Sequence, residues 1–158
     1  MKILGIDPAL TCLGWGVIKF NSPRICYVNS GTVKIDPKMP LHLRLSLISS
    51  SIEKVIDLYK PDSIGMEETF LNINAVSSLK LAYVRGALMA LIGKTQLPYR
   101  EFLPNQIKKT IVGVGHADKT QVKHMVKMIV SGTGDKISFD EADALAVAYT
   151  CLMHKNNI

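Results

Sequence analysis

The feature that most constrains the fold is a change in hydrophobic pattern about one third of the way along the chain. Residues 2–7, 13–20 and 25–34 are short apolar segments separated by turn residues, which is typical of strands joined in a meander. Further along, helical apolar patterns alternate with strand-like segments at 63–67 and 99–103. This order predicts an α/β fold with a mixed five-stranded sheet, its antiparallel meander first, flanked by helices.

The helical segments have recognisable ends. Longer helices are expected at residues 45–59, 75–92, 119–130 and 139–154. Pro61 closes the first of these and Gly93 ends the second, while Pro104 suits the first turn of a further, short helix. Small residues recur along the second helix, which predicts tight packing against another element: Ala75, Ala82, Gly86 and Ala90.

Length and composition set the class of protein. With 158 residues, the chain suits one compact domain spanning residues 1–158. No uninterrupted apolar run approaches the ~18 residues of a membrane-spanning helix, and the start lacks a signal-peptide pattern. The three cysteines lack CxxC spacing, so neither a disulfide framework nor a zinc site is expected. These features favour a cytoplasmic protein with no membrane association.

Positive charge is concentrated in one part of the chain. The formal net charge is +6, and residues 100–136 carry seven basic and three acidic side chains. Lys119, Lys123 and Lys127 are four residues apart on one predicted helix, so they form a stripe that could follow a phosphate backbone. A solvated helix face is the alternative, and Lys108 adds to the case for a nucleic-acid surface.

Four acidic residues stand at the ends of predicted elements. Asp7 ends the first strand, Glu67 ends the fourth, and Asp140 and Asp143 share one face at the start of the last helix. Carboxylates in such apolar surroundings are costly unless something neutralises them, and divalent cations with oxygen ligands do so. Two such ions can assist phosphodiester hydrolysis.

Each acid also has a simpler interpretation. Asp140 could be a helix cap, and Asp7 could be a turn residue before Pro8. Glu68 and Glu141 neighbour the candidate acids but point elsewhere, so they are assigned to solvent or to a supporting role. The set of four is therefore more informative than any member.

Several segments together carry a resemblance to a known family. The segments are GIDPALTCLGWGVI, MEETF, QIKKTIVGVGHADKTQVKHMV and DEADALAVA. From residue 2 to about residue 149, the chain resembles the RuvC family of bacterial Holliday-junction resolvases. The resemblance implies a ribonuclease H-like fold, a homodimer and Mg²⁺-dependent cutting of two symmetry-related strands at a four-way DNA junction, with Mn²⁺ as a substitute ion. It also implies RuvA and RuvB as partner proteins in recombination and DNA repair.

The same resemblance assigns roles to individual residues. It places four acids in the catalytic, metal-binding site: Asp7, Glu67, Asp140 and Asp143. It makes Phe70 an aromatic that engages bases at the junction centre, and it puts Lys108 and Lys119 near the scissile strand. The chain departs from the family pattern at Ala9, where Gly is usual, and at Glu68, where a neutral residue is common.

Two other functions remain open at this point. The chain could be a nucleic-acid-binding module that lacks catalysis, although the presence of all four acids argues against this. It could also be a ribonuclease H-like enzyme that acts on RNA or single strands. Nicking of a synthetic junction, in competition with duplex and hybrid substrates, separates the three.

Overall fold

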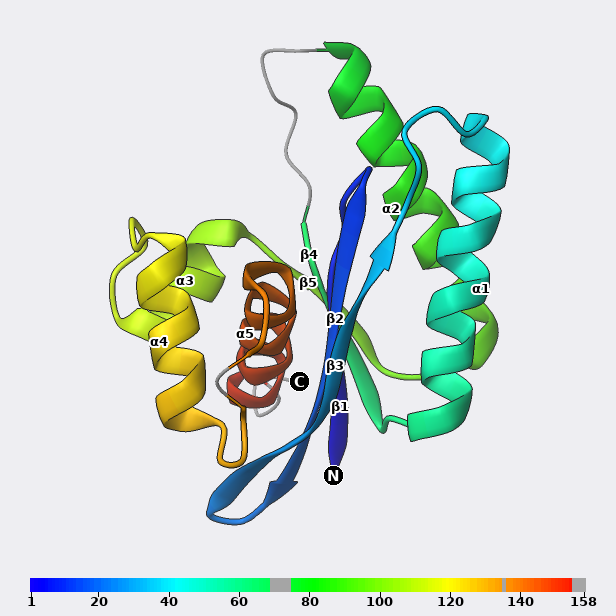
Figure 1. Cartoon of the computed structure of the whole chain (residues 1–158). Helices are drawn as coiled ribbons and strands as arrows, with labels where there is room; N and C mark the ends of the chain where they lie inside the picture. The colour runs from blue at the N-terminus through cyan, green and yellow to red at the C-terminus, as the bar shows by residue number, and fades with distance from the viewer. Residues whose placement is uncertain (69–74, 135, 155–158) are drawn as a thin grey trace.

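The computed structural model describes residues 1–68, 75–134 and 136–154, and Figure 1 shows how their elements are arranged. The strands are β1 (Lys2–Asp7), β2 (Cys12–Asn21), β3 (Arg24–Lys34), β4 (Ser63–Glu67) and β5 (Tyr99–Phe102). The helices are α1 (Leu41–Tyr59), α2 (Ala75–Thr95), α3 (Pro104–Val112), α4 (Lys119–Ile129) and α5 (Phe139–Met153).

The five strands form a mixed sheet in the order β3-β2-β1-β4-β5. The first three pair antiparallel as a meander, with a register shift between Val17 and Ile18. β4 enters beside β1 and runs parallel to it, and β5 runs parallel to β4. The predicted α/β architecture is thus confirmed, and its crossovers bring the carboxyl ends of β1 and β4 to the same edge of the sheet.

Helices cover both faces of the sheet (Figure 1). On one face α1 and α2 enclose a core that includes Leu4, Ile6 and Met66. On the other face α3, α4 and α5 enclose a second core, to which β1 contributes Ile3. Side chains alternate along a strand, so Asp7 has the same orientation as Ile3 and faces α5.

Two helix boundaries differ from the sequence-based prediction by more than one residue. α1 begins at Leu41, one turn earlier than expected, because Pro40 can precede a first turn without a side-chain cap. α2 continues past Gly93 to Thr95, and Gln96 adopts the left-handed conformation after it, with φ of 56°. The glycine therefore lies within the helix, where it costs some stability but does not end it.

The expected packing of the small residues of α2 is not found within the described part of the chain. A Cβ atom added at Gly86 or Gly93 would have no atom within 4 Å. Large apolar side chains share this exposed face, among them Leu79 (53% exposed) and Tyr83 (46%). By length and composition alone, Val76–Thr95 could cross a membrane, a test that core helices of globular proteins also pass.

Candidate active site

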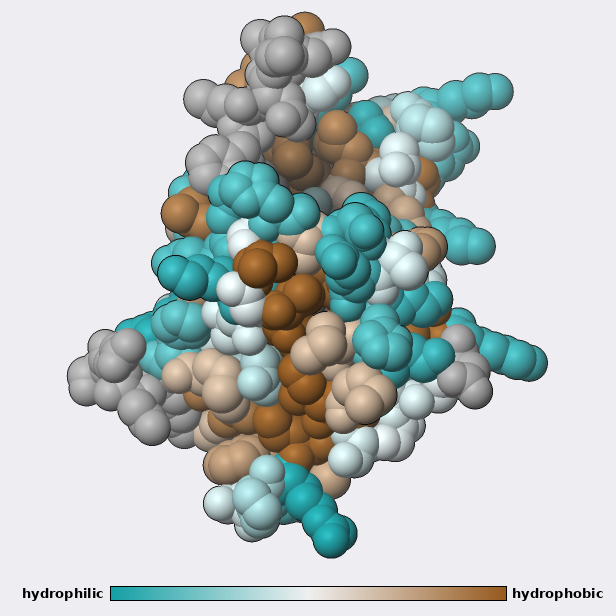
Figure 2. Space-filling model, turned by 90° about the vertical axis from the view of Figure 1, so that its left-hand side faces the viewer, coloured by the Kyte–Doolittle hydropathy of each residue, from teal (hydrophilic) through white to brown (hydrophobic). Residues whose placement is uncertain are grey.

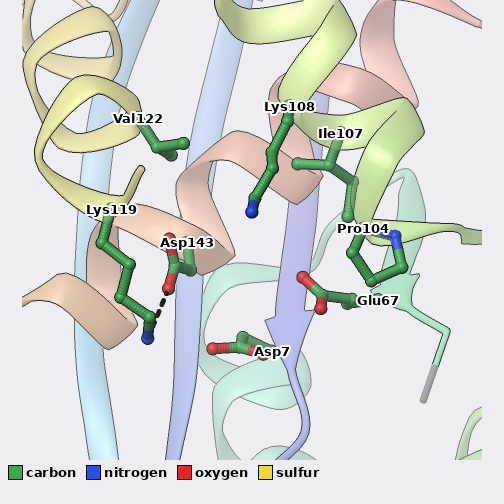
Figure 3. A pocket seen from close by; sticks show the side chains of 8 residues that line it. All are labelled: Asp7, Glu67, Pro104, Ile107, Lys108, Lys119, Val122 and Asp143. Carbon is green, nitrogen blue, oxygen red and sulfur yellow. Dashed lines mark ion pairs between the residues drawn. The ribbon is translucent and has the colours of Figure 1, made fainter. Parts of the chain in front are cut away.

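A pocket of about 190 Å³ lies at the edge of the sheet where β1 and β4 end. Figure 3 shows the side chains that line it, which come from two strands and three helices. They are Asp7, Glu67, Pro104, Ile107, Lys108, Lys119, Val122 and Asp143. Three carboxylates and two ammonium groups therefore share one small volume with apolar walls.

The three carboxylates come from elements that are distant in the sequence. Asp7 is the last residue of β1, Glu67 is the last residue of β4, and Asp143 lies in the second turn of α5. β1 and β4 are parallel neighbours, so their last residues lie side by side. The structure thus brings together three of the four predicted acids (Figure 3).

Close packing of α5 on the sheet places the third carboxylate. A Cβ atom at Gly5 would lie 2.0 Å from the Ala144 carbonyl oxygen, and one at Gly14 would lie 2.1 Å from the Asp140 carbonyl oxygen. Both approaches leave no room for a side chain, so α5 reaches β1 and β2 only because glycine occupies these positions.

The fourth predicted acid, Asp140, lies beside the pocket and does not line it. Its charge contributes to raising the pKa of Asp7 and of Asp143, so it belongs to the same electrostatic group. It does not act as the helix cap, because Ser138 caps α5 by accepting a hydrogen bond from the Glu141 amide. The capping interpretation of Asp140 is therefore wrong.

Glu141 anchors the start of α5 from outside the pocket. Its carboxylate accepts hydrogen bonds from the Ser138 amide at 2.7 Å and from the Ser30 hydroxyl of β3 at 2.9 Å. Its pKa is lowered because these hydrogen bonds favour the charged form and outweigh the burial that opposes it. The prediction that Glu141 has a supporting role agrees with these contacts.

Burial makes the pocket carboxylates unusually basic. The pKa of Asp7 is raised well above its ordinary value, first by burial and then by the charges of Glu67 and Asp143. Burial, and then Asp143, raise the pKa of Glu67 to about 7. Burial also raises the pKa of Asp143. In each case the charged form is disfavoured until positive charge enters the pocket.

Two lysines supply part of that positive charge. The Lys119 ammonium lies 3.2 Å from the Asp143 carboxylate, and its side chain is 64% exposed while that of Asp143 is 17% exposed. Lys108 and Lys119 both lower the pKa of Glu67, although burial outweighs them. The predicted position of both lysines near the acids is thus consistent with the pocket.

The pocket suits a hard divalent cation by its donor chemistry. It offers carboxylate oxygens from three elements, and oxygen atoms are the ligands that Mg²⁺ prefers. The carboxyl groups of Asp7, Glu67 and Asp143 each have a raised pKa, so added positive charge would stabilise their ionised forms. No three Asp, Glu, His or Cys residues of the described ranges stand close enough to form a ready-made metal cluster. The carboxylates would have to move together, and Lys119 would have to move away from Asp143, as a cation entered.

The remaining predicted DNA contacts lie outside the pocket. Lys123 places its ammonium 4.9 Å from the centre of the Phe139 ring, and Lys127 follows one turn later on α4. Figure 2 shows this side of the molecule, where hydrophilic side chains flank a central apolar band. Phe70 lies outside the residues that the structure describes.

The apolar walls of the pocket were missed by sequence reasoning. Ile107 and Val122 are buried, and neither was predicted to belong to the site. Cys12 was also missed: its thiol lies near Asp140, and its pKa is raised first by burial and then by that carboxylate. The sequence did hold a signal for these two apolar residues: Ile107 directly precedes Lys108, and Val122 lies three residues after Lys119.

Comparison with known proteins gives consistent matches over the whole chain. A family model described as "Crossover junction endodeoxyribonuclease RuvC" matches residues 3–151. Proteins of that name from Rickettsia bellii (strain RML369-C) and Rickettsia conorii are 54% and 52% identical over 156 residues, 99% of each chain. The solved structure of Thermus thermophilus RuvC in complex with Holliday junction substrate is 28% identical, with a TM-score of 0.90 over 99% of this chain and 96% of that one. The yeast mitochondrial resolvase Ydc2 shares the fold, with a TM-score of 0.66 at 15% identity over 98% of this chain and 83% of that one.

Proposed function

This chain belongs to the RuvC family of crossover junction endodeoxyribonucleases, and we propose that it resolves four-way (Holliday) DNA junctions in recombination and DNA repair. It is a hydrolase of DNA phosphodiester bonds with a ribonuclease H-like fold. It cuts by paired symmetrical nicks. The observation that carries this proposal is the convergence of Asp7, Glu67 and Asp143 with Lys108 and Lys119 in one pocket.

The nuclease activity of this family depends on a divalent metal ion. We propose that each active site binds two Mg²⁺ ions and that Mn²⁺ can substitute for them. Asp7, Glu67, Asp140 and Asp143 would hold them, since their oxygen donors and mutual repulsion favour added positive charge. When bound, such ions polarise the scissile phosphate and stabilise charge on the attacking and leaving oxygens.

The side chains of the pocket have separate tasks in the reaction. Water attacks the backbone phosphorus, the bond from phosphorus to the 3′ oxygen breaks, and the negative charge that develops on the phosphate oxygens must be stabilised. Lys108 and Lys119 reach into the pocket from α3 and α4 and would donate hydrogen bonds to those oxygens (Figure 3). Ile107 and Val122 restrict water on the same side, which strengthens these interactions.

Junction binding would use surfaces around the pocket. Lys123 and Lys127 continue the basic face of α4 away from Lys119, and they would contact backbone phosphates. Phe70 would stack on a base unpaired at the junction centre, where such stacking contributes about 1–3 kcal/mol.

A homodimer is part of the proposal because paired nicks need two active sites. The exposed face of α2 supports it: Leu79, Tyr83 and Met89 are each more than 40% exposed, and Gly86 leaves the helix backbone open between them. A second copy that packed its own α2 there would bury this uncharged stripe. RuvA and RuvB would be partner proteins in the cytoplasm, and the reduced thiols of Cys12 and Cys26 suit that compartment.

The test is cleavage of an immobile four-way junction labelled on opposite strands. In Mg²⁺ we expect symmetrical nicks in both strands, no cutting in EDTA, and junction binding with little cutting in Ca²⁺. Duplex DNA, single strands and an RNA–DNA hybrid serve as competitors. Binding without cutting in Mg²⁺ would identify a non-catalytic module, and preference for the hybrid would identify a ribonuclease.

A pair of neighbouring variants tests the register of the site. Glu67→Gln should abolish cutting and leave junction binding intact, because Glu67 lines the pocket. Glu68→Gln is the matched control one residue away, and it should retain the larger part of the activity. The opposite result would place the catalytic carboxylate at the neighbouring position.

A further inference from the structure

We propose that Arg85 is a positioning residue for the catalytic carboxylate of Glu67, and that it acts from the opposite face of the sheet through Glu101 and Glu68. This inference rests on the proposed function, because it takes Glu67 to be part of the cleavage site. Arg85 does not line the pocket.

The alternation of side chains along β4 and β5 defines the geometry. Glu67 is paired with Phe102, and these two side chains face α3, α4 and α5. Met66 is paired with Glu101, and Met66 belongs to the core beneath α1 and α2. Glu101 therefore projects from the face opposite the pocket, one position before the residue that lies beside Glu67.

Arg85 of α2 binds Glu101 with both arms of its guanidinium. Its Nε donates to one carboxylate oxygen at 2.5 Å, and a terminal nitrogen donates to the other at 2.6 Å. The side chains are 33% and 17% exposed, so both partners are partly removed from water. This planar, two-bond arrangement fixes orientation as well as distance, and a lysine could not reproduce it.

Glu68 brings a second negative charge to the same arginine. Its amide donates to the Phe102 carbonyl at 2.8 Å, which extends the pairing of β4 with β5 one residue beyond Glu67. The hydrogen bonding to Glu101 raises the pKa of Arg85, and the charges of Glu101 and, to a smaller extent, Glu68 act in the same direction against the effect of burial.

Loss of Arg85 should disturb the pocket by way of the strand ends. Without the two-bond clamp, Glu101 would no longer be fixed at the end of β5. The negative charges of Glu101 and of Glu68, which lies two positions beyond the partner of Glu101, would then lack their shared positive charge, and this would strain the Glu68–Phe102 hydrogen bond. Glu67 is the last residue of β4 and directly precedes Glu68. A weaker Glu68–Phe102 hydrogen bond would therefore loosen the strand end that holds the Glu67 carboxylate in place. Misplacement of a catalytic group by about 1 Å can lower a rate about a hundredfold.

The experiment compares Arg85→Gln and Glu101→Gln with the unaltered protein in three measurements. These are single-turnover junction cleavage at saturating protein, junction affinity in Ca²⁺, and the rise in melting temperature that Mn²⁺ produces without DNA. We expect cleavage to fall about tenfold or more and affinity to change less than about twofold. The Mn²⁺-induced rise should become smaller, because the carboxylates no longer converge on a cation.

Two further variants separate positioning from general stability. The charge exchange Arg85→Glu with Glu101→Arg should restore part of the cleavage rate and of the Mn²⁺ response. Lys94→Gln removes the same charge from the exposed end of α2 and should change none of the measurements. If Arg85→Gln fails to fold, Arg85→Lys keeps the charge without the two-bond geometry and should show the same losses in smaller measure.

The outcomes distinguish this inference from the function on which it rests. If the unaltered protein does not cut junctions, the proposed function fails. If it cuts and Arg85→Gln cuts equally fast with the same Mn²⁺ response, the positioning role is overturned, whatever the change in melting temperature.

Discussion

The two faces of the central sheet differ in the side chains that they carry. The face under α1 and α2 is packed with apolar side chains, among them Ile48, Ile52 and Leu88, which have no solvent exposure. The face under α3, α4 and α5 has an equally buried core, but it opens at one edge into a pocket of three carboxylates and two lysines. The same strands supply both, because alternate residues point to opposite faces.

This difference separates stability from function within a small chain. Carboxylates with a raised pKa destabilise the folded state when they are ionised, so the pocket side carries a cost at neutral pH. The opposite face has no such carboxylate pocket: its core stabilises the fold by burial of apolar side chains, with the Arg85–Glu101 ion pair beside it. Substitutions of the pocket carboxylates and of the apolar core beneath α1 and α2 should therefore affect cleavage and stability in opposite proportions.

Asp7→Asn should give the largest effect. It keeps the shape of the side chain but removes a metal-binding charge, so we expect cleavage to fall about a thousandfold or more while junction binding persists. Since ionisation of Asp7 is disfavoured by burial, the variant should melt at the same or a higher temperature. Nicking rate and calorimetry on one sample measure both, and Asp57→Asn, at an exposed site on α1, is the control. A variant that cuts normally would remove Asp7 from the mechanism.

Ile48→Ala should give the reverse pattern on the opposite face. Ile48 is fully buried between α1 and the sheet, and truncation of such a residue costs about 2–5 kcal/mol of unfolding free energy. Urea unfolding should show this loss, while cleavage well below the melting temperature should stay near the original rate. Ser46→Ala, at an exposed position of the same helix, is the control. A large loss of cleavage in folded Ile48→Ala protein would mean that the apolar core beneath α1 also positions the cleavage site.

The comparison also explains how much of the fold the sequence could predict. Alternating strands and their turns are local patterns, so β1 and β4 were predicted with the residues that the structure shows. The end of α2 was wrong because a glycine stops a helix only where the backbone turns left-handed, and here Gln96 makes that turn. The packing partner predicted for the small residues of α2 is not found within the described chain.

The candidate site also has parts that the sequence could predict and parts that it could not. Acids at strand ends are visible locally, and parallel pairing of β1 and β4 brings two of them together. The pairs that support them are not local: Glu141 binds Ser30 across 111 positions, and Arg85 binds Glu101 across the sheet edge. Such contacts depend on register and helix rotation, which a single sequence does not determine.

Variants of four lysines should separate catalysis from DNA binding on the face that carries the pocket. Lys108→Ala and Lys119→Ala should lower cleavage about tenfold or more with little change in binding, because both side chains line the pocket. Lys123→Ala and Lys127→Ala should instead weaken binding and reduce the slope of affinity against salt by about one each. Nicking rates and salt titrations on the same junction measure both effects. Equal behaviour of all four variants would mean that the basic face acts as one undivided patch.

The smallest predicted effect concerns pH and the metal-free protein. Glu67 has a pKa of about 7 in the fold against an ordinary 4.5, so the folded state binds more protons than the unfolded state between these values. Stability should therefore rise as pH falls through this window, by about 1–2 kcal/mol from Glu67. The buried carboxyls of Asp7 and Asp143 act in the same direction.

Glu67→Gln isolates this contribution. Glu101 and Glu141 have a lowered pKa, so the stability that they contribute is lost only below the window and does not mask the effect. Urea unfolding in EDTA at about pH 5 and about pH 7.5 should show a smaller gain on acidification for Glu67→Gln than for the unaltered protein. At about pH 7.5, saturating Mg²⁺ should remove the loss of stability that ionised Glu67 causes in the unaltered protein. The bound cation then stabilises the ionised carboxylates that burial disfavours. Equal gains for the two proteins in EDTA would mean that Glu67 is not strained by burial, and the contrast between the two faces would then rest on Asp7 and Asp143 alone.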